Sequence, residues 1–270
     1  MQPHCKWRAQ ARLQAISSAK RKNDSLDART LADLLRANLF PACYVPPYEY
    51  ESLRRQLRQR VFWVRAKVMF KNKVAGLLIE SGVPYQKSKL HQKRYFQDLV
   101  EAHSELVEEF QQQLAFNRGQ IARLEQMEDL TIRQLLVHPL LKERVEKLQS
   151  IKGVGPVTAL TWALEIAEPS RFRNERRAIS YCGLCSAERA SAGIQKRGPL
   201  SKQRNPWIQT MLVEAAHIAV RYNPELRAIF EAERQKGPRH RALLEVARRL
   251  VRQLLAVDRK YFAAQTAARA

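Results

Sequence analysis

The sequence predicts a mainly α-helical protein, and three observations lead to this prediction. Apolar residues recur every three or four positions along most of the chain, which is the spacing of one helix face. Only 9 of the 270 residues are glycine. The alternation of apolar and polar residues that marks a half-buried β-strand is nearly absent. We therefore expect helices that pack through apolar stripes.

The first expected helix covers residues 25–38 and begins beside Asp24 and Asp27. Three prolines end it, because proline cannot continue a helix: Pro41, Pro46 and Pro47. In one interpretation the aspartates form a capping box, with Asp24 at the N-cap and Asp27 beside the positive end of the helix. The same spacing also places both carboxylates on one side of the first turn, where they could share a divalent cation. The spacing alone fits both interpretations.

Two long apolar stripes follow, one over residues 53–78 and one over residues 99–124. Their spacing is near 3.5 residues, and the second stripe tolerates polar residues. Gly82-Val83-Pro84 between them is typical of a turn. The pattern predicts an antiparallel helical hairpin or coiled coil.

The first arm of this hairpin is strongly basic. Between residues 52 and 79 there is no acidic residue and there are eight cations: Arg54, Arg55, Arg58, Arg60, Arg65, Lys67, Lys71 and Lys73. A run of charge is ordinarily a solvated helix face. Eight cations without an acid favour a phosphate-facing arm instead, because such charges release counterions from a polyanion.

The overall charge also favours a polyanionic partner. The chain holds 48 Lys and Arg against 26 Asp and Glu, a formal net charge of +22, which indicates nucleic acid first and an anionic membrane second. No apolar window of about 18 residues exists, so we expect no membrane span. Four cysteines are too few for a disulfide scaffold, so a reducing cytoplasm is the expected location. Cys182 and Cys185 fit packing better than zinc or redox chemistry, since no further ligands stand at suitable spacing.

The clearest local motif is the segment 151–159, which resembles a helix-hairpin-helix. Two glycines let the backbone turn tightly and approach a phosphate, and the helix that follows offers free N–H groups. We expect DNA backbone contacts here from Lys152, Gly153, Gly155 and Thr158. The alternative is an ordinary glycine turn between packed helices. Three helices, at 206–221, 224–235 and 239–263, are expected to close the chain, the first capped by Asn205 and Pro206.

Ser191 lies in a small-residue loop inside a strongly basic stretch. By itself it is a loop serine, because no Ser-His-Asp order is visible in the sequence. The neighbouring cations are predicted to contact DNA: Arg189, Lys196, Arg197 and Lys202.

Taken in order, these segments resemble a known family. Lys22-Asn23-Asp24-Ser25-Leu26-Asp27-Ala28, Ser191-Ala192-Gly193 and Leu200-Ser201-Lys202-Gln203-Arg204-Asn205 are similar to motifs of the DEDD transposases. This family includes the pilin-gene invertases and the RNA-guided insertion-sequence recombinases. The resemblance covers roughly residues 15–260, and the joint order of its motifs is more specific than any one of them.

The resemblance implies a fold and an activity. Residues 1–40 would be the end of a RuvC-like catalytic domain, 48–144 the hairpin or coiled coil, and 145–265 the C-terminal domain with the helix-hairpin-helix. Asp24 and Asp27 would be the last two carboxylates of the metal set, and Ser191 the nucleophile that becomes linked to DNA. The first Asp and the Glu of that set would lie before residue 1, so we expect an N-terminally truncated transposase that holds Mg²⁺ only when those carboxylates are supplied.

The resemblance also implies partners. These are duplex DNA, a structured guide RNA as used by some members, and further copies of the chain on DNA, in the bacterial nucleoid. The alternative is a non-enzymatic, basic helical protein that binds DNA or RNA. Two departures from the family pattern indicate divergence or decay: Arg204 replaces a glycine, and Trp207-Ile208-Gln209 replaces the usual Leu-Arg ending.

Overall fold

The computed structural model describes residues 23–39, 44–103, 106, 108–191, 194–202 and 204–268, with side chains left out over 187–197. These residues are mainly helical, as the sequence predicts. They form two compact units, Met1–Tyr48 and Glu49–Ala270, each treated by itself below. In the described part of the chain, no helix is both long enough and apolar enough to cross a membrane. The division into 1–40, 48–144 and 145–265 stays a prediction.

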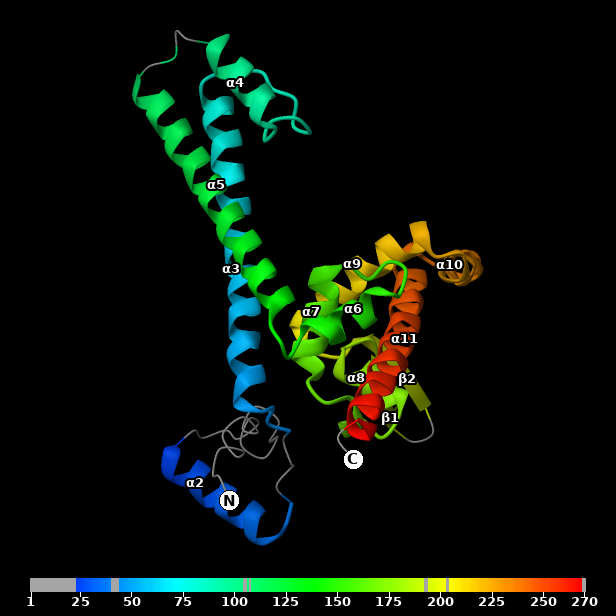
Figure 1. Cartoon of the computed structure of the whole chain (residues 1–270). Helices are drawn as coiled ribbons and strands as arrows, with labels where there is room; N and C mark the ends of the chain where they lie inside the picture. The colour runs from blue at the N-terminus through cyan, green and yellow to red at the C-terminus, as the bar shows by residue number, and fades with distance from the viewer. Residues whose placement is uncertain are drawn as a thin grey trace. The chain divides into compact units, whose positions relative to one another are not determined.

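The first unit contributes α2, which runs over Asp24–Arg36 and confirms the first expected helix (Figure 1). Its N-cap is Asn23, whose Oδ1 accepts a hydrogen bond from the Ser25 N–H at 2.9 Å. The prediction that Asp24 is the cap is therefore wrong by one residue. The reason is that Asn23 has the extended backbone of a cap, with φ −147° and ψ 130°, so Asp24 becomes the first helical residue.

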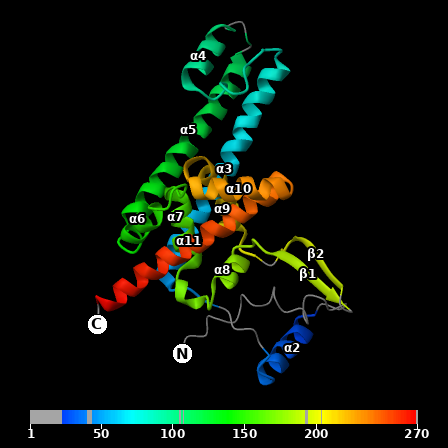
Figure 2. The ribbon, with the colours of Figure 1, turned by 90° about the vertical axis from the view of Figure 1, so that its right-hand side faces the viewer.

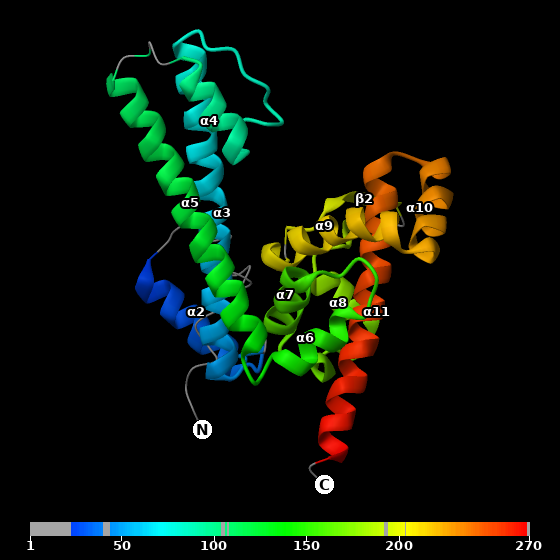
Figure 3. The same ribbon diagram turned by 45° about the horizontal axis from the view of Figure 1, so that its top comes forward.

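The second unit begins with an antiparallel pair of long helices, α3 (Tyr48–Glu80) and α5 (Glu108–Val137), which lie side by side in Figures 1 and 3. Ion pairs between their facing sides connect Arg60 to Glu128 and Lys71 to Glu125. A separate apolar core joins α3, α5 and the short helix α4 (Lys93–Glu101): Val74, Leu77, Leu78, Val83, Leu90, Phe96, Leu114 and Ile121. The predicted hairpin is present.

The second predicted stripe, 99–124, is not one helix. The helix α4 ends at Glu101, and α5 begins at Glu108. The His103 side chain explains the break, because its Nδ1 lies 2.9 Å from the Leu99 carbonyl. That carbonyl would otherwise accept the backbone N–H of residue 103, which instead bonds to Val100 at 3.2 Å.

The rest of the second unit is a helical domain around α7 (Figure 2). Its helices are α6 (Lys142–Gln149), α7 (Pro156–Ile166), η3 (Pro169–Arg171), α8 (Glu175–Tyr181), α9 (Pro206–Tyr222), α10 (Pro224–Lys236) and α11 (Arg239–Ala267). Every residue of α7 from Thr158 to Ile166 is buried. The last three helices confirm the expected closing helices, and α11 packs against α6, α8, α9 and α10.

A buried ion pair stabilises this domain. Arg144 on α6 donates from Nε and Nη2 to the two carboxylate oxygens of Asp258 on α11, both at 2.7 Å. The Trp162 indole on α7 donates to Asp258 Oδ2 at 2.9 Å. Both charged side chains are fully buried, so neither could lose its partner without leaving an uncompensated charge in the core.

The stretch expected to be a loop around residue 191 forms an antiparallel β-hairpin instead, with β1 at Ser186–Ser191 and β2 at Ile194–Leu200 (Figure 2). Ser186 pairs with Leu200, and a bulge lies between Ser186 and Glu188. The prediction relied on alternating apolar residues, which both segments lack. The hairpin is paired through backbone N–H and C=O groups, which nearly every residue supplies.

Candidate nucleic-acid interface

The turn between α6 and α7, with the first turn of α7, holds four of the residues expected to contact DNA: Lys152, Gly153, Gly155 and Thr158. Gly153 adopts φ +97°, and a Cβ placed on it would lie 2.5 Å from the Cα of Ala219 in α9. This glycine is therefore required by the close packing of the turn on α9, as an ordinary glycine turn would require it.

The other three residues of the turn differ in exposure. Lys152 and Gly155 are exposed, and Gly155 is the N-cap of α7, where an added Cβ would meet open space. The Thr158 side chain is buried. Lys152 and the backbone at Gly155 are thus accessible to a ligand, whereas Thr158 could contact one only through its backbone N–H in the first turn of α7.

Five of the eight cations of α3 have acidic partners, which lie on other helices. Arg58 pairs with Glu165 on α7, and Arg54 lies 3.7 Å from the same carboxylate. The remaining pairs are with α5: Arg60–Glu128, Lys67–Glu128, Lys67–Glu125 and Lys71–Glu125. The premise of an uncompensated arm is therefore wrong for five of the eight. Three are exposed and form no ion pair with a described residue: Arg55, Arg65 and Lys73.

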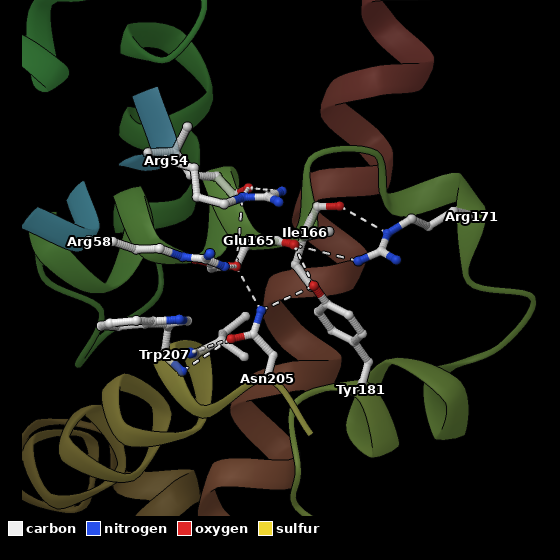
Figure 4. A network of polar contacts seen from close by, with 10 residues as sticks. Arg54, Arg58, Glu165, Ile166, Arg171, Tyr181, Asn205 and Trp207 are labelled. Atoms are coloured by element: carbon white, nitrogen blue, oxygen red, sulfur yellow. Dashed lines mark hydrogen bonds and ion pairs between the residues drawn. The ribbon is translucent and has the colours of Figure 1, made fainter. Parts of the chain in front are cut away.

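A polar network is built around Glu165, near the end of α7 (Figure 4). Its side chain is 1% exposed. Arg58 donates to its two oxygens from Nε at 2.8 Å and from Nη2 at 2.7 Å, and Asn205 Nδ2 donates to Oε2 at 2.7 Å. One buried carboxylate thus connects α3, α7 and the residue before α9.

The backbone carbonyls at the end of α7 are part of the same network. Arg54 donates to the Leu164 carbonyl from Nε at 2.9 Å and from Nη2 at 2.6 Å, and Tyr181 OH donates to the Glu165 carbonyl at 3.0 Å. These bonds satisfy carbonyls that a helix end leaves without partners. Burial lowers the pKa of Arg54, and the charge of Glu165 opposes that shift.

Asn205 connects the network to α9. Its Oδ1 accepts from the N–H groups of Trp207 at 3.1 Å and Ile208 at 3.4 Å, which confirms the expected cap. Its backbone N–H donates to the Tyr181 carbonyl at 3.1 Å, and the Ser201 N–H donates to the Cys185 carbonyl at 3.0 Å. The segment that follows the β-hairpin is therefore held at both ends.

Ser191 is the last residue of β1 and pairs with Ile194, so it lies beside the hairpin turn. For four predicted site residues the structure describes the backbone, which lies in the β-hairpin, and not the side chain: Arg189, Ser191, Lys196 and Arg197. Lys202 is exposed just after β2.

Asp24 and Asp27 stand in the first turn of α2, the first exposed and the second half-buried. Two carboxylates leave most of the octahedral shell of Mg²⁺ to other ligands. Within the described ranges, no group of three or more His, Cys, Asp and Glu side chains is placed to hold a metal ion. The pair fits part of a metal site and does not complete one.

Cys182 and Cys185 are free thiols that belong to the packing. Burial raises the pKa of Cys182, which keeps this thiol protonated and unreactive. Between them, Gly183 has φ +74°, and a Cβ there would lie 2.7 Å from the Cβ of Arg204. Arg204, which the resemblance predicts to replace a glycine, thus lies against Gly183, and its Nη1 donates to the Ser201 carbonyl at 3.2 Å.

Glu165 and Tyr181 were not among the site residues predicted from the sequence. A signal for Glu165 was present, because it is the one acid within the apolar run of α7, PVTALTWALEI. A charge in such a run must be paired when the helix is buried all round. Its partners Asn205 and Arg58 lie 40 and 107 residues away in the sequence, so no local pattern could identify them.

Two family models match the chain. One, described as Transposase IS116/IS110/IS902 family, matches residues 145–231. The other, a transposase model of the DEDD, IS110 type, matches residues 5–81. The first contains the α6–α7 turn, the β-hairpin, and Glu165, Tyr181 and Asn205 of the polar network. The second contains Asp24 and Asp27, together with Arg54 and Arg58 of the same network.

Three curated relatives are similar to the chain over about three quarters of its length. A Sinorhizobium fredii protein named as a transposase (y4qE) is 30% identical over 205 residues, which are 76% of this chain and 50% of the relative. A Pseudomonas aeruginosa protein named as a family 20 transposase is 26% identical over 74% of this chain and 61% of its own length. The transposase for insertion sequence element IS1111A of Coxiella burnetii is 23% identical over 74% and 56%. The chain thus spans about half to three fifths of these relatives.

Proposed function

This chain belongs to the IS116/IS110/IS902 family of transposases, and we propose that it binds DNA and contributes to the strand cleavage and transfer of transposition. The order of the matched segments carries the proposal. The aspartate pair of α2, the long hairpin, the α6–α7 turn and the hairpin with Ser191 follow one another as the family resemblance requires.

The proposed nucleophile is Ser191. Its Oγ attacks the phosphorus of a DNA phosphodiester, so that a serine–phosphorus ester bond forms and the bond from phosphorus to one deoxyribose oxygen breaks. The serine proton ends on the released hydroxyl. The position of Ser191 beside a hairpin turn supports this role, because a turn can reach a phosphate that a core residue cannot.

Asp24 and Asp27 are the proposed carboxylates of a RuvC-like domain that would include residues 1–40. With further ligands they would hold a divalent cation, Mg²⁺ by preference, which stabilises negative charge at the phosphoryl centre when bound. Within this chain the two side chains supply anionic oxygens on one helix turn.

The proposed DNA contacts are backbone contacts. Lys152 and Gly155 in the α6–α7 turn, taken as a helix-hairpin-helix within a domain at 145–265, would contact phosphate, as would Lys202 after β2. In the hairpin at 48–144, α3 would add the three exposed cations that form no ion pair with a described residue: Arg55, Arg65 and Lys73. By the family resemblance, we also propose that the chain binds a structured guide RNA and associates with further copies of itself on DNA.

Two measurements test the proposal. In a gel-shift titration the chain should bind duplex DNA with an affinity that falls steeply with salt, and Lys152→Gln should weaken it more than Lys260→Gln on α11. In a chimaera that places the N-terminal part of the Pseudomonas aeruginosa relative before this chain, DNA should yield a covalent adduct on a denaturing gel. Ser191→Ala should abolish the adduct, and Ser201→Ala should retain it.

A second candidate is a non-enzymatic DNA- or RNA-binding clamp. The exposed Lys152 and Lys202 favour it, because such cations would contact phosphate without any chemical step. The two candidates differ in one outcome: a clamp would bind DNA in the gel-shift titration and give no adduct in the chimaera.

A further inference from the structure

A cavity of about 390 Å³ lies between α3, α7 and α9, within the second unit. Its volume falls in the range of about 300–1,000 Å³ that is typical of small-ligand sites. Apolar side chains of α3 and α9 form part of its wall, among them Val61, Val64 and Met211. Arg58, Glu165 and Trp207 line it, and Figure 4 shows these three side chains in the Glu165 network.

Trp207 gives this cavity an aromatic surface. The indole is half-buried, and the Arg58 guanidinium lies 5.3 Å from the centre of its ring. Arg58 is fixed in place by its two hydrogen bonds to Glu165. Two flat groups held beside each other against apolar side chains suit a flat aromatic ligand.

The charge of the cavity indicates a second feature of that ligand. The carboxylate of Glu165 neutralises Arg58, and Glu128 neutralises Arg60. Arg65 also lines the cavity, is exposed, and forms no ion pair with any residue that the structure describes. One cation is therefore available for an anion at the solvent side.

The beginning of α9 does not supply a competing anion site. Asn205 Oδ1 already accepts from the N–H groups of Trp207 and Ile208, and proline at the first position has no N–H. An anionic group at this cavity would thus be bound by Arg65. An aromatic surface next to a single free guanidinium matches a nucleobase and its neighbouring phosphate.

We propose that this cavity binds an unpaired nucleobase of a single-stranded nucleic acid, with the base on Trp207 and a phosphate at Arg65. The proposal rests on the proposed function, since it takes nucleic acid as the partner. The strand must be unpaired, because bases inside a duplex are stacked on one another and cannot enter a protein cavity.

The test separates the base from the phosphates. The full chain is titrated with a dT oligomer and with an abasic oligomer of the same length, which carries the same charge. The dT oligomer should bind roughly tenfold more tightly, as expected for base–aromatic stacking. Trp207→Leu, which keeps an apolar side chain, should remove that difference and leave the affinity for the abasic oligomer within about twofold. An rU oligomer in parallel shows whether the base comes from RNA or DNA.

Three further variants keep the outcome clear. Trp207→Phe should retain most of the base-dependent difference. Phe62→Leu, which removes an exposed aromatic of α3 outside the cavity, should retain all of it. Arg65→Gln should weaken the binding of both oligomers about equally.

If Trp207→Leu unfolds the chain, the Trp207→Phe and Arg65→Gln variants still test the site. Equal loss for both oligomers in folded Trp207→Leu, or no difference between them in the unaltered chain, would overturn the proposal. Failure of the chain to bind any nucleic acid would instead overturn the proposed function.

Discussion

The buried carboxylate of Glu165 gives the sharpest test of how the hairpin is joined to the C-terminal helices. Replacing it by glutamine keeps the size of the side chain and removes its charge. The amide would present one N–H₂ group where Arg58 and Asn205 now donate, so at least one of three hydrogen bonds to this side chain would be lost. The Arg54 guanidinium, 3.7 Å from Oε2 and nearly buried, would also lose its counter-charge.

The size of the effect follows from burial. Removing one partner of a buried ion pair costs about 3–5 kcal/mol. The Arg58 side chain is 31% exposed and can turn toward water, whereas Arg54 is 8% exposed and cannot. We therefore expect Glu165→Gln to lower the free energy of unfolding by about 3 kcal/mol, at the lower end of that range. For a unit of this size the melting temperature should fall by roughly 6–12 °C.

Thermal melting followed by circular dichroism measures the global effect, and amide hydrogen exchange locates it. Exchange should rise in the first turns of α3 and at the start of α9, because both are held to α7 through this carboxylate. Glu168→Gln is the matched control, since Glu168 is exposed and accepts only from Ser170 among the described contacts. A fall of less than about 2 °C, with unchanged exchange at both sites, would refute this account of the network.

Three other substitutions have defined outcomes. Gly153→Ala should cost at least about 3 kcal/mol in urea denaturation, because it combines a positive φ with a clash against α9, while Gly155→Ala should cost less than about 1 kcal/mol. Asp258→Asn should cost about 3–5 kcal/mol by leaving Arg144 uncompensated in the core, and Arg144→Met combined with Asp258→Leu should recover part of that loss. Burial alone would raise the pKa of Glu128, but hydrogen bonds and charges from two α3 cations lower it overall. Its contribution to stability is therefore present above the ordinary value of 4.5 and lost below it, so the difference in melting temperature between the unaltered chain and Glu128→Gln should shrink as the pH falls from about 6 to about 3.

The helices were predictable because their signals are local. Proline at the first turn and asparagine before it define the start of α9 in both sequence and structure. Gly82, with φ +68°, ends α3 where the sequence predicts a turn. The break between α4 and α5 was missed because it depends on one His103 contact within an otherwise continuous apolar pattern. The β-hairpin was missed because its pairing leaves no alternation to detect.

The charges of α3 could not be assigned from the sequence. The partners of Arg58, Arg60 and Lys71 lie 107, 68 and 54 residues further along, so counting acids within one segment could not find them. The excess of cations in α3 has a different physical meaning from the one predicted. Most of these cations form ion pairs that hold helices together, and three have no ion pair with a described residue and could contact a polyanion.

The family resemblance predicts two departures, at Arg204 and Trp207, which can be judged by what these side chains contact. Decay of a gene leaves large polar residues where small ones stood, without compensating partners, and such residues cost about 1–3 kcal/mol each when buried. Arg204 instead lies against Gly183, the only kind of residue that leaves room there at φ +74°, and donates to the Ser201 carbonyl. Trp207 lies beside Arg58, which Glu165 holds in place. Arg204 and Trp207 thus each have a partner that accommodates the side chain, which favours divergence of a folded domain over decay. The oligomer-binding test of Trp207 measures whether that divergence produced a base-binding site.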